Sequence, residues 1–167
     1  MIKNFNLLLI FIFSLSVNAF GMQDNQKHSN DYKLKNLEIE RLYIYNTPKG
    51  AKTAAGFMKI ENDGNKDDQL ISVTNVTFSD KTELHEMNVN NKIMKMRPIK
   101  SLTIKNNSEV YLKSSGYHIM FIGLKNQIIE GRHYKATLNF KNSGSIDVMF
   151  VAVNRGYHPD DNHHKHH

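Results

Sequence analysis

The sequence predicts an all-β domain, built as a sandwich or a small barrel. Apolar and polar residues alternate with a period of two in several short segments, as they do in strands that bury one face. Clusters of turn-forming residues separate these segments. No segment keeps apolar residues at helical spacing over the roughly 11 positions that a helix prediction requires. The three observations agree on short strands joined by turns.

The expected strands follow one another along the chain. The alternation is clearest at residues 37–40, 58–61, 138–141 and 146–150. The turn clusters lie at residues 48–50, 63–65, 106–108, 114–116 and 142–144. The turn at 114–116 comes directly before His118 and Met120, so we expect this pair on a strand, near its end.

The first 19 residues have the features of a secretory signal peptide. Lys3 supplies a positive charge, an apolar run begins at Leu7, and small residues end the segment at Ala19. An uncleaved membrane anchor is the less favoured alternative, because the run is shorter than the roughly 20 apolar residues that span a bilayer. We expect cleavage after Ala19 and export to the periplasm, with no stable membrane insertion afterwards.

The remaining chain divides into three parts. Residues 20–36 are mostly polar and lack periodicity, which predicts a flexible leader. Residues 37–155 have the length of a single domain with one core. Residues 156–167 are polar and rich in histidine, which predicts a disordered tail.

Composition excludes several classes of function. The 167 residues include no cysteine, which excludes a disulfide framework and also a blue-copper centre, whose chemistry needs a cysteine thiolate. The net charge is +6, but the lysines are scattered and the chain is expected to be exported, so nucleic acid is not the expected partner. An acidic protein or an anionic membrane surface fits the charge better.

Soft metal-ligand side chains stand out in this cysteine-free sequence. Histidine and methionine occur at His85, Met96, His118 and Met120, and imidazole nitrogen with thioether sulfur suits Cu(I). Residues two apart on a strand share a face, so His118 and Met120 can converge on one ion. Further methionines at Met87 and Met94 have the same spacing from a candidate ligand, and they are interpreted as packing residues, rim residues or reserve ligands. Spacing alone does not choose among Met87, Met94 and Met96.

The local sequence around these residues resembles the PCu(A)C family of periplasmic copper chaperones. The matching segments are Thr-Glu-Leu-His-Glu-Met at 82–87, Met-Lys-Met-Arg-Pro at 94–98 and Gly-Tyr-His-Ile-Met-Phe-Ile-Gly-Leu-Lys at 116–125. Upstream, Ala-Ala-Gly-Phe at 54–57 and Glu-Asn at 61–62 also match. The resemblance implies a cupredoxin-like Greek-key sandwich.

The ligand pattern of that family is His-x10-Met-x21-His-x-Met. Carried over position by position, it selects His85, Met96, His118 and Met120 as ligands of one Cu(I). The resemblance also implies a function, a metallochaperone that delivers copper to a respiratory oxidase. The implied acceptor is the CuA centre of cytochrome c oxidase subunit II or another copper oxidase, reached directly or with a Sco-type thiol protein.

The tail holds a second group of donors, His163, His164, His166 and His167. A histidine-rich tract is a borderline nitrogen-donor site that suits Cu(II), so we expect a secondary copper site there. A scavenging tract without defined stoichiometry and a remnant of cloning are the alternatives.

The sequence does not indicate an enzyme. The acids Asp67, Asp68, Glu83 and Glu86 are interpreted as solvated loop or rim charges, and no serine lies in a nucleophile elbow. Three functions compete with the chaperone: periplasmic copper sequestration or resistance without specific delivery, electron transfer on a cupredoxin-like scaffold, and a structural sandwich with methionines in its core.

Overall fold

The computed structural model describes residues 31–90 and 93–157, so the predicted signal peptide, most of the leader and the histidine-rich tail lie outside the described residues. The described residues form strands and no helix, which confirms the all-β prediction. The strands are β1 (Tyr32–Leu34), β2 (Leu37–Tyr45), β3 (Thr53–Asn62), β4 (Asp68–Thr74), β5 (Ser79–Asn90), β6 (Ile93–Ile99), β7 (Leu102–Ile104), β8 (Ser108–Leu112), β9 (Tyr117–Leu124), β10 (His133–Phe140) and β11 (Gly144–Val153).

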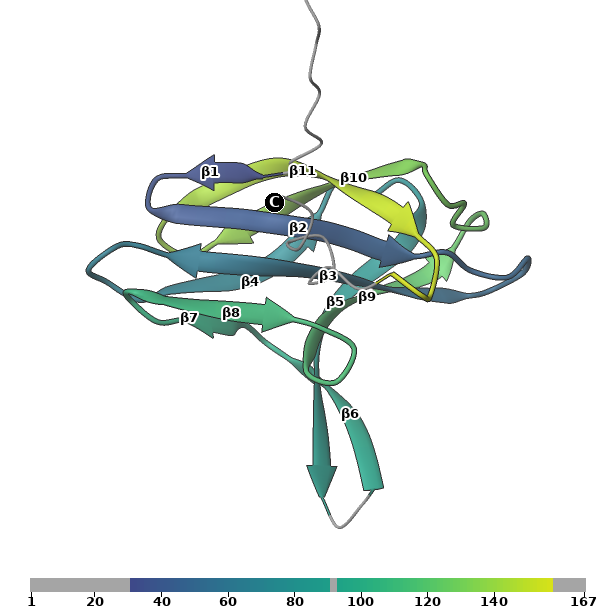
Figure 1. Ribbon diagram of the computed structural model, residues 1–167, viewed down its shortest axis with the longest axis horizontal. Helices are drawn as coiled ribbons and strands as arrows, with labels where there is room; N and C mark the ends of the chain where they lie inside the picture. Colours follow the sequence, from purple (N-terminus) through teal and green to yellow (C-terminus); the bar gives the residue numbers. More distant parts are fainter. Residues whose placement is uncertain (1–30, 91–92, 158–167) are drawn as a thin grey trace, which may run out of the picture.

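One continuous sheet runs through the described part of the chain, in the order β6-β5-β9-β8-β3-β2-β11-β10-β4-β7, with β1 added beside β2. Most pairs are antiparallel, whereas β11 pairs with β2 and β8 with β9 in parallel. The sheet curls until β4 meets β5, where the Thr82 hydroxyl donates a hydrogen bond of 2.5 Å to the Val73 carbonyl. The result is a nearly closed, barrel-like sandwich (Figure 1).

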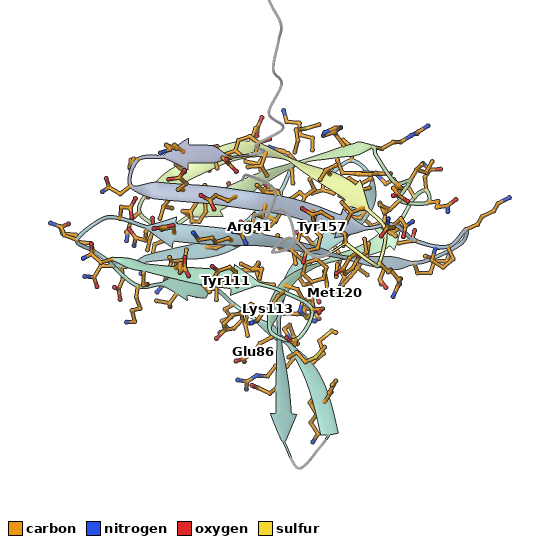
Figure 2. The ribbon with its side chains drawn as sticks, viewed as in Figure 1. Arg41, Glu86, Tyr111, Lys113, Met120 and Tyr157 are labelled. Carbon is orange, nitrogen blue, oxygen red and sulfur yellow. The ribbon has the colours of Figure 1, made fainter. Side chains whose placement is uncertain are left out.

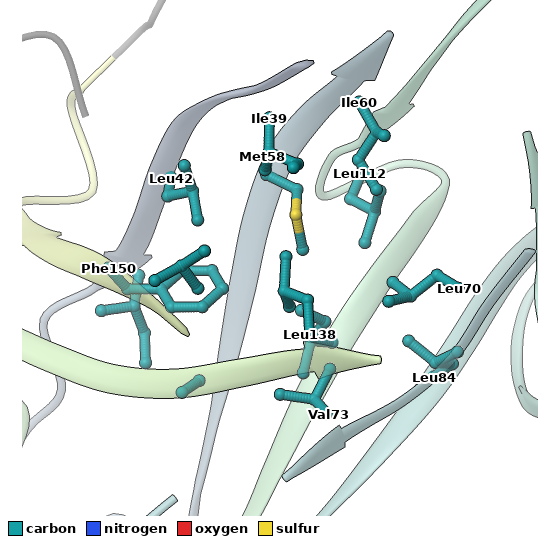
Figure 3. Packing of buried hydrophobic residues seen from close by; sticks show 14 of the residues in the cluster. Ile39, Leu42, Met58, Ile60, Leu70, Val73, Leu84, Leu112, Leu138 and Phe150 are labelled. Carbon is teal, nitrogen blue, oxygen red and sulfur yellow. The ribbon is translucent and has the colours of Figure 1, made fainter. Parts of the chain in front are cut away.

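A single hydrophobic core fills the space inside this sheet (Figure 3). Inward side chains come from every second position of the strands, as the alternation in the sequence predicts. Fully buried members include Phe121, Phe150, Ile39, Ile60 and Leu138. Because one cluster joins residues from both ends of the described chain, the prediction of a single domain is confirmed.

The β5–β6 hairpin extends away from the body of the sheet (Figure 1). The first part of β5 pairs with β9 as far as Glu86, opposite Tyr117. Beyond that point β5 pairs only with β6, with Met87 directly opposite Met96. The hairpin therefore has a base held in the sheet and an outer part that pairs only within itself.

The folded part is longer at both ends than the sequence predicts. Tyr32 and Leu34 of β1, in the predicted leader, pack partly buried against the core, and the Tyr32 hydroxyl accepts a hydrogen bond from the Met149 amide at 2.9 Å. Tyr157, in the predicted tail, packs its ring 5.3 Å from that of Tyr43. In the described ranges there is no helix with the length and apolar character to cross a membrane.

Asp68 fixes the turn between β10 and β11. Its side chain is only 3% exposed and accepts hydrogen bonds from the backbone amides of Asn142 at 2.9 Å and Ser143 at 3.0 Å. Burial alone would raise the pKa of this carboxyl, but the hydrogen bonds from Ser143, Asn142 and Gln69 outweigh burial and lower the pKa below 3.8. Asp68 is therefore a structural anion and not a solvated loop charge.

We predict that Asp68→Asn lowers the free energy of unfolding at pH 7 by about 1–3 kcal/mol, because a charged acceptor of buried amides is lost. A lowered pKa contributes stability above the unfolded-state value near 3.8, and this contribution is lost as the pH falls through the folded-state pKa. The difference between the two proteins should therefore shrink at pH 3. Urea unfolding at both pH values measures it.

The matched control is Asp147→Asn. Asp147 is an exposed carboxylate 2.6 Å from Lys135, and an exposed ion pair of this kind contributes little to stability. Equal losses of stability in the two variants at pH 7 would contradict the anchoring role of Asp68.

Candidate metal centre

Two histidines face each other across neighbouring strands. His85 on β5 is directly opposite His118 on β9, with ring centroids 5.7 Å apart and ring planes inclined by 48°. Directly opposite residues of an antiparallel pair point to the same face of the sheet. The register of β5 against β9 therefore brings together two imidazoles that are 33 positions apart in the chain.

A carboxylate orients the ring of His85. Its Nε2 lies 2.8 Å from Oε2 of Glu83, two residues earlier on the same strand face. Hydrogen bonds from Lys81 and then from His85 lower the pKa of Glu83, so its ionised carboxylate can only accept. The hydrogen bond therefore places a hydrogen atom on Nε2, and in the neutral form of His85 the lone pair is on Nδ1.

A backbone carbonyl orients His118 in the opposite sense. Nδ1 of His118 donates to the Gly116 carbonyl at 3.1 Å, which leaves the lone pair on Nε2. Burial lowers the pKa of His118, which is only 2% exposed, and the hydrogen bond to the Gly116 carbonyl offsets only part of this shift. The same Gly116 oxygen accepts the Met87 amide at 3.1 Å, so one carbonyl links the turn before β9 to the hairpin.

The two lone pairs have no partner within the protein. Nδ1 of His85 and Nε2 of His118 are, among the described residues, the only buried side-chain nitrogen or oxygen atoms without a hydrogen bond. Buried polar atoms are almost always satisfied, so such a pair requires an explanation. Two neutral nitrogens, each held by a hydrogen bond through the other ring atom, form the arrangement found in metal-binding histidines.

Methionine sulfurs adjoin this pair. Met87, Met96, Met120 and His118 line one cavity of about 300 Å³, together with Phe57. The Met120 position is opposite both Glu83 on β5 and Ala55 on β3, which places it on the histidine face of the sheet. Figure 2 shows Met120 near the base of the hairpin. The structure thus gathers His118, Met96 and Met120 around one space, with His85 beside them.

Met94 is the outermost of the predicted residues. It is on the same face of β6 as Met96 but two positions farther along the hairpin, and it is 70% exposed. His163, His164, His166 and His167 lie outside the described residues, and their predicted site stays a prediction.

Nitrogen and oxygen donors alone do not make a site here. Within residues 31–90 and 93–157, no three histidine or acidic side chains are grouped so that they could hold a metal ion. A metal at the two histidines would need sulfur from methionine to complete its coordination, and this donor set favours a soft monovalent ion.

Sequence reasoning missed the two groups that orient the histidines. Glu83 was interpreted as a rim charge, although its place two residues before His85 puts both side chains on one strand face. Gly116 acts through its carbonyl, which leaves no signal in the side-chain pattern. The spacing Glu-x-His on a strand could have indicated the first.

Comparison with known proteins identifies the family. The LpqE-like family model, whose description names a lipoprotein, matches residues 37–153. The chain belongs to the LpqE-like family. The comparison with curated proteins gives no match.

Solved structures with the same fold are PCuAC domains. The LpqE-like chain aligns with the apo PCuAC domain from PmoF1 at a TM-score of 0.64 and 18% identity, over 74% of this chain and 98% of that domain. The copper-bound PCuAC domain from PmoF2 gives 0.64 and 17%, over 74% and 97%. The Cu(I) form of DR1885 from Deinococcus radiodurans gives 0.55 and 18%, over 80% and 86%. The PCu(A)C resemblance and the cupredoxin-like fold that it implies are confirmed.

We predict that the two site histidines of the LpqE-like protein are opposite tautomers without metal. Near pH 8, His85 should carry its hydrogen on Nε2 and His118 on Nδ1, because each donates to an acceptor that cannot itself donate. Long-range ¹H–¹⁵N correlation spectra distinguish the two forms.

Glu83→Ala should convert His85 to a mixture of tautomers and leave His118 unchanged. Glu86→Ala, which removes a carboxylate of the same strand that pairs with Arg97 on the other face, is the control. A single shared tautomer in the unsubstituted protein would show that these hydrogen bonds do not hold the rings.

Proposed function

We propose that this LpqE-like protein is an exported Cu(I) metallochaperone. The observation that carries the proposal is the pair of buried, unpartnered imidazole nitrogens beside a methionine-lined cavity. Copper is the cargo, held by Nδ1 of His85, Nε2 of His118 and the sulfurs of Met96 and Met120. Copper-bound relatives of the same fold, the PmoF2 domain and Cu(I) DR1885, support this assignment.

The donor set suits an ion that must be both held and released. The two imidazoles are oriented in advance by Glu83 and Gly116, which lowers the cost of ordering them when copper binds. Thioethers are neutral and bind Cu(I) without the charge attraction of thiolates. Met96 is 48% exposed on the projecting hairpin, where ligands of an acceptor can displace it first.

The acceptor that we propose is a copper centre with cysteine ligands. The CuA centre of cytochrome c oxidase subunit II, or the centre of another copper oxidase, supplies thiolates that bind Cu(I) more strongly than neutral donors do. A Sco-type thiol protein can act as the intermediary in this transfer. Such a transfer takes place in the periplasm, to which the predicted signal peptide would export this protein. Sequestration uses the same site but needs no acceptor, so delivery separates the two functions.

The histidine-rich tail is proposed as a secondary Cu(II) site. His163, His164, His166 and His167 are borderline donors, whereas the site on β5, β6 and β9 depends on sulfur. Protein that ends at Tyr157 should therefore lose Cu(II) uptake and keep its Cu(I) affinity. Unchanged Cu(II) capacity in that protein, measured by titration, would show that the tail does not bind copper.

We predict that His118→Ala and Met120→Leu each weaken Cu(I) binding by more than about 100-fold. Loss of a group that only orients a metal ligand costs about 10–100-fold, so loss of a ligand itself should cost more. Competition against a chromogenic Cu(I) chelator measures the affinity. Met149→Leu is the control, because Met149 is a half-buried thioether on β11, away from the cavity. Equal affinities in all three variants would contradict the ligand assignment.

Delivery is tested by mixing Cu(I)-loaded protein with a reduced, metal-free soluble CuA domain. The copper should move to the CuA domain, because its thiolates are charged and softer than the donors on this protein. Size-exclusion chromatography followed by metal analysis of each fraction measures the distribution. Copper that stays with this protein, together with copper sensitivity of cells that lack the gene, would favour sequestration.

A further inference from the structure

The methionines around the cavity form a series of increasing exposure. Met120 and Met87 are half-buried beside the histidines, Met96 is 48% exposed, and Met94 is 70% exposed on the outer part of the hairpin. His118, at the other end of the series, is almost completely buried. The series runs from solvent to the unpartnered nitrogens.

The strand register places three of these sulfurs within reach of one ion. Met87 and Met96 are directly opposite, and the Cβ atoms of such a pair are about 4.5–5.5 Å apart. Met94 is two positions from Met96 on the same face, at about 7 Å along the strand. Methionine has three rotatable side-chain bonds and can close such a gap.

Core packing does not explain Met94. Met94 is 70% exposed, and the buried core cluster of the described residues does not include Met94 or Met96. The hairpin also separates its side chains by face: Lys95 and Arg97 are on the face opposite the methionines, and Arg97 pairs with Glu86 at 2.8 Å. One face of the hairpin is therefore charged and the other carries sulfur.

We propose that Met94, Met96 and Met87 form a second Cu(I) site, a thioether capture site through which copper passes to and from the histidine pair. This inference rests on the proposed function, because it assumes Cu(I) as cargo. The chemistry is ligand exchange without redox change: bonds from copper to the sulfur of Met120 and to the two imidazoles form as its bonds to Met94 and Met87 break. Met96 belongs to both sites, and copper remains Cu(I) throughout.

The direction of movement follows from the donors. The capture site offers three neutral sulfurs on an exposed hairpin, whereas the inner site adds two imidazoles that are already oriented. Copper should therefore rest at the inner site and occupy the capture site in transit. When Met96 already binds the ion of the inner site, a second equivalent is left with the two sulfurs of Met87 and Met94.

The experiment compares Met87→Leu/Met94→Leu with Met149→Leu. Leucine keeps the volume and apolar character of methionine and removes only the sulfur. Stopped-flow transfer of Cu(I) from its bicinchoninate complex should be slowed about tenfold or more in the double variant, while the affinity at equilibrium changes less than about threefold. Met149→Leu should load at the unsubstituted rate.

Silver supplies a second measurement, because Ag(I) is a soft d10 ion like Cu(I) and inert to redox chemistry. Titration of protein labelled with ¹³C at the methionine methyl groups should shift Met96 and Met120 with the first equivalent. Met94 and Met87 should shift with the second equivalent.

Three outcomes would overturn the capture site. If the double variant loads as fast as the unsubstituted protein, the capture site is wrong and the proposed function remains. If the double variant loses as much affinity as Met120→Leu, Met87 or Met94 is a ligand of the inner site. If unsubstituted protein does not bind Cu(I), or His118→Ala has no effect on binding, the proposed function itself fails.

Discussion

The pairing of β5 with β9 determines the rest of the candidate centre. Leu84 and Ile119 are opposite one another on the inner face and are both buried. Their immediate neighbours, His85 and His118, are opposite one another on the outer face. A shift of β5 by one residue would turn Leu84 out of the core and His85 into it, and the two imidazoles would no longer share a face. The hydrophobic core therefore fixes the distance between the two histidines.

Two acceptors then decide what the histidines can do. A histidine between solvent and protein could present either nitrogen, but Glu83 and the Gly116 carbonyl each take one hydrogen and leave one lone pair on each ring. Gly116 also binds the Met87 amide, so the position of the hairpin and the orientation of His118 depend on the same carbonyl. The centre is rigid on the sheet side and open on the hairpin side.

The sequence predicted the parts of the fold that have one buried face. The alternation at 138–141 and 146–150 lies in β10 and β11, and the pair His118 and Met120 does lie on a strand. The outer part of the β5–β6 hairpin also alternates, with methionines on one face and charged residues on the other, but its segments at 87–90 and 94–97 are short and were interpreted only as possible metal ligands, so a strand pair was not predicted there. β1 has only three residues, too few for a periodic signal. The role of Glu83 was also not predicted, because it depends on the hydrogen bond between its carboxylate and the ring of His85.

Charge around the cavity agrees with a soft monovalent cargo. Of the described residues that line it, none is acidic, and Arg155 is positive. Divalent ions such as Ca²⁺ and Mg²⁺ need several oxygen ligands and usually carboxylates, which this lining does not supply. The carboxylate of Glu83 reaches the centre only through the His85 ring, where it can balance part of a single positive charge. A centre with neutral sulfur, two imidazoles and one indirect anion would therefore favour a bound ion both for its softness and for its low charge.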